Sequence, residues 1–344
     1  MSYKVLVTGG TGYIGSHTVV ELLQNDFETI IVDNLCNSQI EVLDGIQKIT
    51  GIKPAFEQFD LCDLQKLRDC CRKYMGINAI VHFAALKAVG ESVEKPLEYY
   101  GNNLISMINL LRVMREFNIP NLVFSSSCTV YGQPDKLPVT EDSPIKPANS
   151  PYGNTKQISE EIMRDTIAVS SGIKAISLRY FNPVGAHESA LIGELPSGTP
   201  LNLVPYITQT AIGIRKELRV FGNDYDTPDG TGIRDYIYVV DLAKAHVKAI
   251  ERLLENKCKK AFEVFNLGTG KGLSVLEIVH TFEKATGQKL NYKIYPRRPG
   301  DIARVYADTT LANIELGWKA DTPLEKTLLS AWNWEKNVRK MRNP

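Results

Sequence analysis

Short apolar runs recur through the first half of the chain and contain many valine and isoleucine residues. They lie over residues 5–7, 29–32, 55–59, 79–83, 122–124 and 175–178. Most of these runs are continuous rather than alternating, which is typical of strands in a parallel sheet covered on both faces. We therefore predict that these segments form the strands of a buried parallel sheet.

Segments with the period of an amphipathic helix separate these predicted strands, for example residues 14–24 and 64–74. A rhythm of strand, helix and strand along a chain indicates an α/β fold with a doubly wound parallel sheet. We predict that this sheet forms a first domain over residues 1–181.

The regular rhythm ends near residue 183. Residues 185–205 are rich in Gly, Pro and Ser and predict a long loop, and loops of that length commonly carry function. Residues 222–232 form a second predicted loop, rich in Gly and Asp. We predict a smaller α/β lobe, mainly over residues 182–344, that contacts a substrate and from which the chain can return to the first domain.

Composition narrows the function classes. The 344 residues include 40 Lys and Arg against 39 Asp and Glu, a net charge of +1, without the basic excess typical of nucleic-acid binders. No apolar run approaches the roughly 18 residues that span a bilayer. The six cysteines form no CxxC pair, and the five histidines are scattered. We expect reduced thiols, a cytoplasmic location, no metal, no nucleic-acid partner and no membrane partner.

A glycine-rich turn follows the first predicted strand. Residues 8–15 read Thr-Gly-Gly-Thr-Gly-Tyr-Ile-Gly, with Gly9, Gly12 and Gly15 at the entrance to a helix. Glycines there allow a dinucleotide's pyrophosphate to approach the backbone, as in a Rossmann fold. Asp33 ends the second strand, where a carboxylate binds the adenosine ribose and repels a 2′-phosphate. These features predict NAD rather than NADP. Asp60 ends the third strand and is either an adenine contact or a helix N-cap.

A second constellation lies near residue 150. Ser150 and Pro151 predict a helix start, and Ile158, Ile162 and Val169 predict its apolar face. Tyr152 and Lys156 then lie one turn apart, so that the ammonium is expected to lower the tyrosine pKa from about 10 toward neutrality. Such a tyrosine can act as a general acid or base. Ser127 lies at the carboxyl end of the fifth strand, where such sheets bind ligands.

These motifs together resemble the extended short-chain dehydrogenase/reductase family and, within it, the nucleotide-sugar 4-epimerases. The resemblance extends over almost the whole chain and rests on residues 9–18, 32–35, 82–92, 96–100, 124–132, 150–156, 179–187, 221–225 and 229–236. It implies reversible 4-epimerisation of UDP-galactose and UDP-glucose, by transient oxidation at C4 with retained NAD. It also implies a homodimer formed through helices near residues 106–117 and 159–169.

The resemblance assigns roles residue by residue. Ser127, Tyr152 and Lys156 match the catalytic trio. The implied NAD contacts are Gly9, Gly12, Tyr13, Ile14, Gly15, Asp33, Asn34, Asp60, Leu61, Phe83, Ala84, Lys87, Asn102, Tyr152, Lys156 and Tyr180. The implied nucleotide-sugar contacts are Ser127, Asn182, Asn202, Leu203, Phe221, Arg234, Arg298, Asp301 and Val305.

Val305 bears on which sugars fit. Some bacterial epimerases of the family carry a tyrosine there, which narrows the pocket beside the 2-substituent of the sugar. Valine is smaller, so the resemblance predicts that UDP-GlcNAc and UDP-GalNAc are also interconverted. The alternative is that Val305 only packs against its own loop.

Two other classes of function stay open at this point. The first is another enzyme on this scaffold, a nucleotide-sugar 4,6-dehydratase or a UDP-glucuronate decarboxylase. Those enzymes carry carboxyl side chains where this chain has Cys128 and Thr129. The second is a non-catalytic dinucleotide sensor, which would usually lack the Tyr/Lys pair.

Overall fold

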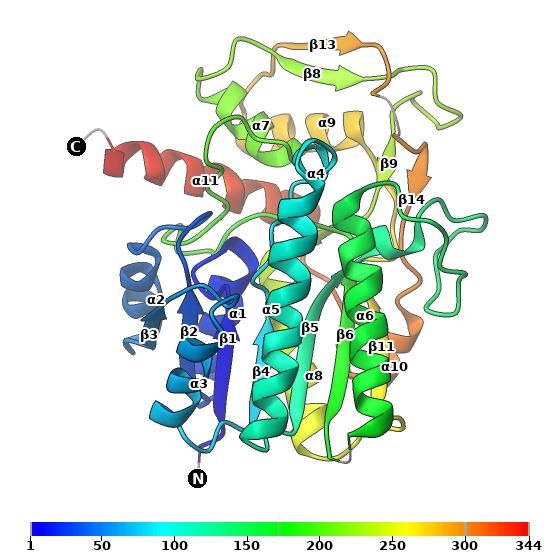
Figure 1. The fold of residues 1–344 in the computed structure, drawn as a ribbon. Coiled ribbons are helices and arrows are strands. Elements are labelled where there is room, and N and C mark those ends of the chain that lie inside the picture. Colours follow the sequence, from blue (N-terminus) through cyan, green and yellow to red (C-terminus); the bar gives the residue numbers. More distant parts are fainter. Residues whose placement is uncertain (1, 171, 299–300, 343–344) are drawn as a thin grey trace.

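The computed structural model describes residues 2–170, 172–298 and 301–342. Its centre is a seven-stranded parallel sheet in the order β11-β6-β5-β4-β1-β2-β3 (Figure 1). The strands are β1 (Lys4–Thr8), β2 (Glu28–Asp33), β3 (Ala55–Gln58), β4 (Ala79–His82), β5 (Asn121–Ser127), β6 (Lys174–Tyr180) and β11 (Phe262–Leu267). The prediction of a doubly wound α/β fold is confirmed, and each predicted strand is present.

Helices cover both faces of this sheet. One face is covered by α3 (Leu64–Lys73), α5 (Pro96–Glu116) and α6 (Pro151–Val169). The other is covered by α1 (Tyr13–Gln24), α2 (Val42–Thr50) and α8 (Val239–Leu254). Because the central strands meet helices on both sides, their side chains are almost completely buried, as the apolar runs predicted, whereas the edge strand β3 is only partly buried. The edge strand β11 and helix α8 come from beyond residue 182 and pack on the main sheet.

Smaller elements gather above the carboxyl ends of the parallel strands (Figure 1). The strands there form three small sheets: β7 (Asn182–Val184) with β10 (Tyr236–Tyr238), β8 (Leu218–Phe221) with β13 (Tyr292–Tyr295), and β9 (Ile233–Arg234) between β12 (Leu273–Ser274) and β14 (Arg304–Val305). The helices are α7 (Leu203–Ala211), α9 (Val275–Thr286) and α11 (Leu324–Arg342). Ile207, Phe282 and Trp332 belong to their separate apolar core.

Three short helical segments pack against the main sheet or its helices: α4 (Val89–Glu94), the 3₁₀ turn η1 (Cys128–Tyr131) and α10 (Thr310–Glu315). None of the helices in the described part of the chain combines the length and the apolar character needed to cross a membrane. Within the described ranges, no group of three or more His, Cys, Asp or Glu side chains is arranged to hold a metal ion.

Helix α6 begins as predicted but buries a different face. The Ser150 hydroxyl accepts a hydrogen bond from the backbone N–H of Gly153 at 3.2 Å, and Pro151 is the first helical residue. The predicted apolar face is wrong: Ile158 and Ile162 are only partly buried, and Val169 is 82% exposed. The buried face instead holds Lys156, Ser159, Glu160, Met163 and Ile167. Glu160 is buried because it binds polar residues of β5 and β6, and a pattern of apolar residues does not reveal such a contact.

Candidate active site

The glycine turn places bare backbone against the end of β4. Gly9 has φ +71°, and a Cβ atom on it would lie only 2.7 Å from the backbone nitrogen of Ala84. A Cβ on Gly15 would lie 2.2 Å from the carbonyl oxygen of Gly9. Gly12 is the N-cap of α1 and offers no side-chain cap, so the first amides of this helix remain available. A cradle that a side chain would fill, at a helix N-terminus, fits a pyrophosphate.

Asp33, the last residue of β2, is hydrogen-bonded to the glycine turn. Its carboxylate accepts hydrogen bonds from the backbone N–H of Thr11 at 3.2 Å and of Leu35 at 2.9 Å. The neighbouring Asn34 side chain donates to Asp60 at 3.0 Å. The N-cap of α3 is Asp63, which sets aside the alternative that Asp60 caps this helix. The carboxylates of Asp33 and Asp60 therefore lie at the same edge, beside the glycine turn.

Ser127, Tyr152 and Lys156 meet where β5 ends and α6 begins. Ser127 is the last residue of β5, and its hydroxyl accepts a hydrogen bond from the N–H of Thr129 at 3.2 Å. The Lys156 ammonium is buried and donates to the carbonyl oxygen of Ser125 at 2.6 Å. It lies 5.8 Å from the centroid of the Tyr152 ring. The sequence thus predicted residues that the structure brings together.

The ionisation of this cluster differs from the sequence prediction. Burial raises the pKa of Tyr152 to about 12, and interaction with the Ser127 side chain only partly opposes that effect. Burial lowers the pKa of Lys156 to about 7. The prediction that Lys156 brings the tyrosine pKa toward neutrality is therefore wrong for the protein's own groups. Burial of the phenol destabilises the phenolate more than the partly neutral Lys156 amine stabilises it.

Aromatic residues line the edge next to this cluster. Tyr180 ends β6, and its hydroxyl is hydrogen-bonded to the Ser125 hydroxyl. Phe83 follows β4, and both rings pack against His246 of α8, with centroid separations of 4.8 Å for Phe83 and 5.7 Å for Tyr180. The backbone carbonyl oxygen of Asn102, on α5, accepts a hydrogen bond from the Cys62 thiol. The predicted NAD contacts thus share the carboxyl edge of the sheet.

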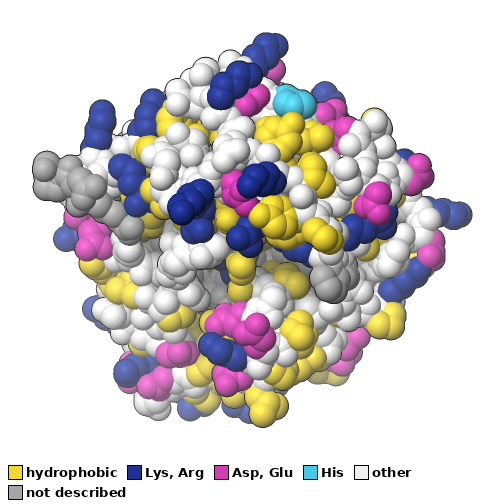
Figure 2. Space-filling view, turned by 90° about the horizontal axis from the view of Figure 1, so that it is seen from above, with side chains coloured by type: hydrophobic (Ala, Val, Ile, Leu, Met, Phe, Trp, Pro, Cys, Tyr) yellow, Lys and Arg dark blue, Asp and Glu magenta, His cyan; other side chains and the backbone are white. Residues whose placement is uncertain are grey.

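The smaller lobe contributes two guanidinium groups that share one carboxylate. Asp301 accepts from Arg234 at 2.9 Å through one oxygen, and from Arg298 at 3.1 Å through the other. The Arg298 guanidinium also lies 4.9 Å from the centroid of the Phe221 ring. Figure 2 shows Lys and Arg side chains near a hollow on the face seen from above. The arrangement offers two cations and one aromatic face to an anionic aromatic ligand such as a nucleoside diphosphate.

Val305 connects this lobe with the end of β5. It pairs with Arg234 between strands β14 and β9 and is only 7% exposed. Its side chain lies in an apolar cluster with Tyr131 and Phe181, against which Cys128 packs. Cys128 directly follows Ser127. Val305 therefore packs with residues outside its own loop, on the side of the catalytic cluster.

The long loop between β7 and α7 carries a residue that the sequence did not single out. Glu194 accepts a hydrogen bond from the Asn202 side chain at 2.7 Å, and its carboxylate lies 3.8 Å from the Lys87 ammonium. It therefore links a predicted NAD contact to a predicted sugar contact. No periodic pattern marks residues 185–203, so nothing distinguished Glu194 from a surface acid. Asn182 begins β7, and its N–H donates to Asp235, while Leu203 begins α7.

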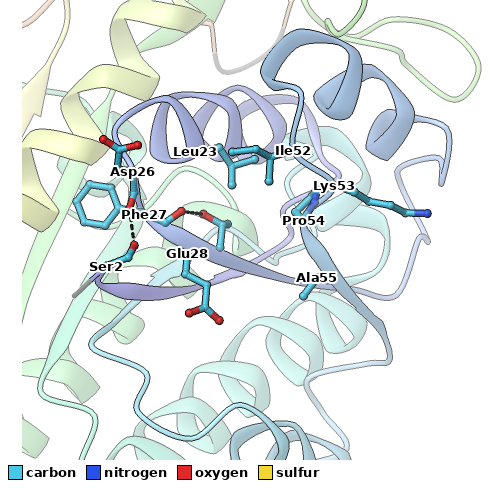
Figure 3. Close-up of a pocket in the computed structure, with 10 residues that line it drawn as sticks. Ser2, Leu23, Asp26, Phe27, Glu28, Ile52, Lys53, Pro54 and Ala55 are labelled. Carbon is cyan, nitrogen blue, oxygen red and sulfur yellow. Dashed lines mark hydrogen bonds between the residues drawn. The ribbon is translucent and has the colours of Figure 1, made fainter.

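One described pocket lies at the opposite edge of the sheet, where β2 and β3 begin (Figure 3). It has a volume of about 310 Å³, and its lining includes Phe27, Glu28 and Lys53. None of the predicted site residues lines it. Sheets of this kind bind ligands at the carboxyl ends of their strands, so this pocket does not compete with the site described above.

The fold and the site define a nucleotide-sugar enzyme of the extended short-chain dehydrogenase/reductase class. The family model described as GDP-mannose 4,6 dehydratase matches residues 6–330. The UDP-glucose 4-epimerase of Haemophilus influenzae is 51% identical over 97% of both chains. The human UDP-glucose 4-epimerase is 50% identical over 98% of this chain and 97% of its own length. The chain belongs to the UDP-glucose 4-epimerase family, which confirms the resemblance.

Solved structures agree with these relatives. The epimerase from Stenotrophomonas maltophila, with bound NAD and formylated UDP-arabinopyranose, has a TM-score of 0.95 and 48% identity. The alignment covers 98% of this chain and 99% of that chain. The epimerase from Bifidobacterium longum, in complex with NAD⁺ and UDP, has a TM-score of 0.93 and 48% identity, with the same coverage.

Proposed function

We propose that the chain is an NAD-dependent UDP-glucose 4-epimerase, which interconverts UDP-galactose and UDP-glucose through transient oxidation at C4. Relatives at about 50% identity over nearly the whole length support the activity, and related structures hold NAD. The predictions of an enzyme, of this reaction and of this cofactor are confirmed. The observation that carries the mechanism is the convergence of Ser127, Tyr152 and Lys156 at the carboxyl edge, beneath the paired arginines.

The residues of the first lobe fit NAD. We assign the pyrophosphate to the turn at Gly9, Gly12 and Gly15, where added Cβ atoms would collide with backbone. Asp33 is assigned to the adenosine ribose. The remaining contacts proposed for NAD are Tyr13, Ile14, Asn34, Asp60, Leu61, Phe83, Ala84, Lys87, Asn102, Tyr152, Lys156 and Tyr180. When bound, oxidised NAD supplies a hydride acceptor and a positive charge that favours a nearby phenolate.

Tyr152 is assigned as the proton shuttle. Its phenolate oxygen takes the proton of the sugar 4-hydroxyl and returns it to that same oxygen after the ring has turned over. Ser127 donates a hydrogen bond to the reacting oxygen, which stabilises charge that develops there. The carbonyl oxygen of Ser125 accepts a hydrogen bond from Lys156 at 2.6 Å, which fixes the lysine nitrogen 5.8 Å from the centroid of the Tyr152 ring. Because the pKa of Tyr152 is about 12 in the protein alone, we expect the ionised form only in the assembled complex.

The smaller lobe is assigned to the nucleotide. Arg234 and Arg298 bind the diphosphate, and Asp301 orients both guanidinium groups. Phe221 contacts the uracil. Asn182, Asn202 and Leu203 complete the proposed sugar-nucleotide contacts. Fixing the diphosphate while leaving the flat 4-keto sugar few contacts allows the ring to turn over and expose its other face.

The dehydratase alternative lacks its acid. Elimination of water from a nucleotide sugar needs a carboxyl group beside the reacting carbon atoms. Cys128 and Thr129 occupy that stretch, directly after Ser127. Burial raises the pKa of the Cys128 thiol to about 12, so the thiol is a poor source or acceptor of protons at neutral pH. The site therefore favours return of the hydride to C4.

We further propose that UDP-GlcNAc and UDP-GalNAc are substrates. Val305 packs beside Cys128 in the apolar cluster next to Ser127, which supports a place beside the sugar. A valine leaves more volume there than a tyrosine, and steric exclusion is what rejects a larger 2-substituent.

Domain roles are assigned along the chain. We propose that residues 1–181 bind NAD and that residues 182–344 mainly bind the nucleotide sugar. The return of α8 and β11 to the main sheet supports the prediction that part of the second segment belongs with the first domain. The phenol and the arginines would then meet the two ends of one substrate.

A homodimer and a cytoplasmic location are proposed as well. Ile105 on α5 and Val169 on α6 are exposed apolar side chains, which supports an interface through these two helices. All six cysteines are free thiols, which suits a reducing compartment. Sedimentation of the purified protein tests the dimer.

Incubation of the purified protein with UDP-galactose tests the proposed activity. We expect UDP-glucose to appear without added cofactor, and NAD to be released when the protein is denatured. A 4-keto-6-deoxy product would instead support the dehydratase alternative. Release of mostly NADP would contradict the assignment of Asp33.

A further inference from the structure

A carboxylate with unusually many partners lies below the catalytic cluster. Glu160 is 3% exposed and follows Lys156 by one turn of α6. One of its oxygens accepts from the hydroxyls of Ser126 at 2.6 Å and of Ser177 at 2.7 Å. The same oxygen accepts from Nε of Arg179 at 3.0 Å, while the other oxygen accepts from its Nη2. Glu160 therefore joins α6 to β5 and β6.

Two of the residues that Glu160 binds are next in sequence to residues of the active site. Ser126 stands between Ser125, whose carbonyl oxygen holds the Lys156 ammonium, and Ser127, the proposed hydrogen-bond donor to substrate. Arg179 precedes Tyr180, whose hydroxyl contacts Ser125. Fixing the middle residue of the serine run fixes the directions of its two neighbours, because successive residues of a strand point to opposite faces.

The junction also contributes charge. Burial alone would raise the pKa of Glu160. The Arg179 guanidinium and the two hydroxyls lower the pKa by more than burial raises it, so the net shift is downward and the group is a carboxylate. Glu160 raises the pKa of Lys156 against the larger effect of burial. The other titratable groups around Lys156 are uncharged at neutral pH: Tyr152 on α6, Tyr180 on β6, and His82 on β4, whose pKa burial lowers to about 3.

We propose that Glu160 and Arg179 form a positioning pair for the epimerase reaction: they hold Ser127 and Lys156 in register and balance the charge felt by the Lys156 ammonium. The catalytic purpose of this positioning rests on the proposed function, whereas the charge coupling to Lys156 does not. The pair itself touches neither substrate nor NAD. Its members carry opposite charges, so removing one is expected to disturb Lys156 more than removing both.

The sign of each change follows from the charges. Glu160→Gln leaves the Arg179 cation unbalanced, which disfavours a second cation at Lys156 and lowers its pKa. Arg179→Met leaves the Glu160 carboxylate unbalanced, which favours the ammonium and raises that pKa. The double variant removes both charges, so the pKa of Lys156 should lie between those of the two single variants. Nearby charges in protein interiors shift pKa values by about 1–3 units.

A second buried ion pair provides a matched control. Arg252 of α8 and Glu263 of β11 are joined at 2.7 Å and are similarly buried, at the amino end of β11, far along the strand from the site. Glu263→Gln is expected to lower the melting temperature, as Glu160→Gln does, because both variants break a buried pair. It is not expected to change the ionisation of Lys156.

Carbon-13 NMR of lysine Cε tests the proposal, with the Lys156 signal assigned by its loss in Lys156→Met. We expect the titration midpoint to fall by about one pH unit in Glu160→Gln, to rise in Arg179→Met, and to stay in place in Glu263→Gln. The alkaline limb of the pH–rate profile should move in the same directions. An unmoved midpoint in Glu160→Gln, with only a lower melting temperature, would overturn the proposal.

The double variant Glu160→Gln/Arg179→Met decides the matter if a single variant does not fold. A midpoint displaced by clearly less than the unit expected for Glu160→Gln supports the pair, and a full unit of displacement overturns it. If the variants shift the midpoint as expected but the wild-type protein forms no UDP-glucose, the proposed function is refuted while the charge coupling stands. If the wild-type protein epimerises UDP-galactose but the variants leave the midpoint unmoved, the positioning pair is refuted and the proposed function stands.

Discussion

The two lobes build their parts of the site in different ways. In the first lobe, functional side chains follow the ends of long strands and begin long helices, so a regular scaffold positions them. In the second lobe, Arg234 and Val305 lie on two-residue strands, and Arg298 and Asp301 lie in a loop. Their positions depend on contacts between distant segments, such as the shared carboxylate of Asp301. We therefore propose that the chemistry resides on the lobe of long strands and helices, and recognition on the lobe made of short elements.

Burial separates the two lobes as well. Lys156 is 4% exposed, whereas the Arg298 side chain is 54% exposed. Buried groups have strongly shifted pKa values, and the pKa of Lys156 is lowered to about 7, into the range that acid–base chemistry uses. The half-exposed Arg298 can exchange one diphosphate for another without a large desolvation cost, whereas the Arg234 side chain is only 18% exposed. Substitutions in the first lobe should therefore affect turnover, and those in the second lobe should affect substrate affinity and choice.

The largest expected effect is on the first lobe. Tyr152→Phe removes only the phenolic oxygen, so the fold and bound NAD should persist while kcat falls at least about 10²-fold. Lys156→Met should be at least as damaging. Tyr74→Phe, at a tyrosine that contacts Glu57 far from the site, is the control. Near wild-type turnover in Tyr152→Phe would contradict the assignment.

Val305→Tyr sharpens the comparison, because it changes substrate choice without touching a reacting group. The larger ring should occlude the volume beside the 2-substituent, so interconversion of UDP-GlcNAc and UDP-GalNAc should be lost while UDP-galactose still turns over. Competition assays with both substrates measure this selectivity. Val305→Ile, which adds one methyl group, should retain both activities. A wild-type enzyme that leaves UDP-GlcNAc unchanged would refute the steric argument.

Arg234→Met tests whether the second lobe acts through binding. Losing a charge-assisted contact worth about 1.5–3 kcal/mol should raise KM for UDP-galactose by roughly tenfold to a hundredfold, with a smaller change in kcat. Arg304→Met, at an exposed arginine that contacts Asp226, should leave both constants near the wild type. A fall in kcat alone would place Arg234 with the reacting groups instead.

The smallest effect is expected at Asp33. Thr11 and Leu35 donate to different oxygens of Asp33, so Asp33→Asn keeps an acceptor for only one of them and loses the negative charge. We expect NAD affinity to fall by less than about tenfold and discrimination against NADP to weaken. Fluorescence titration of the apoprotein with both reduced cofactors measures the ratio. An unchanged ratio would show that another group rejects the 2′-phosphate.

Sequence patterns predicted the first lobe better than the second. Apolar runs marked the strands, because both faces of the sheet are covered, and the glycine turn and Ser150 marked two helix starts. The buried face of α6 was mispredicted, because Glu160 is buried by pairing with Arg179, which apolar periodicity does not record. A carboxylate one turn beyond Lys156 was nevertheless a readable signal. Glu194 and the Asp301 bridge depend on contacts across loops, for which local sequence carries no signal.

The fate of the hydrogen on C4 tests the central claim most directly. UDP-galactose carrying deuterium at C4 is incubated with the protein in ordinary water, and the resulting UDP-glucose is examined by mass spectrometry and NMR. We expect deuterium to be retained at C4, because the hydride leaves C4 and returns to it within the same site. Deuterium lost to water, or found at C6 of a deoxy sugar, would contradict it.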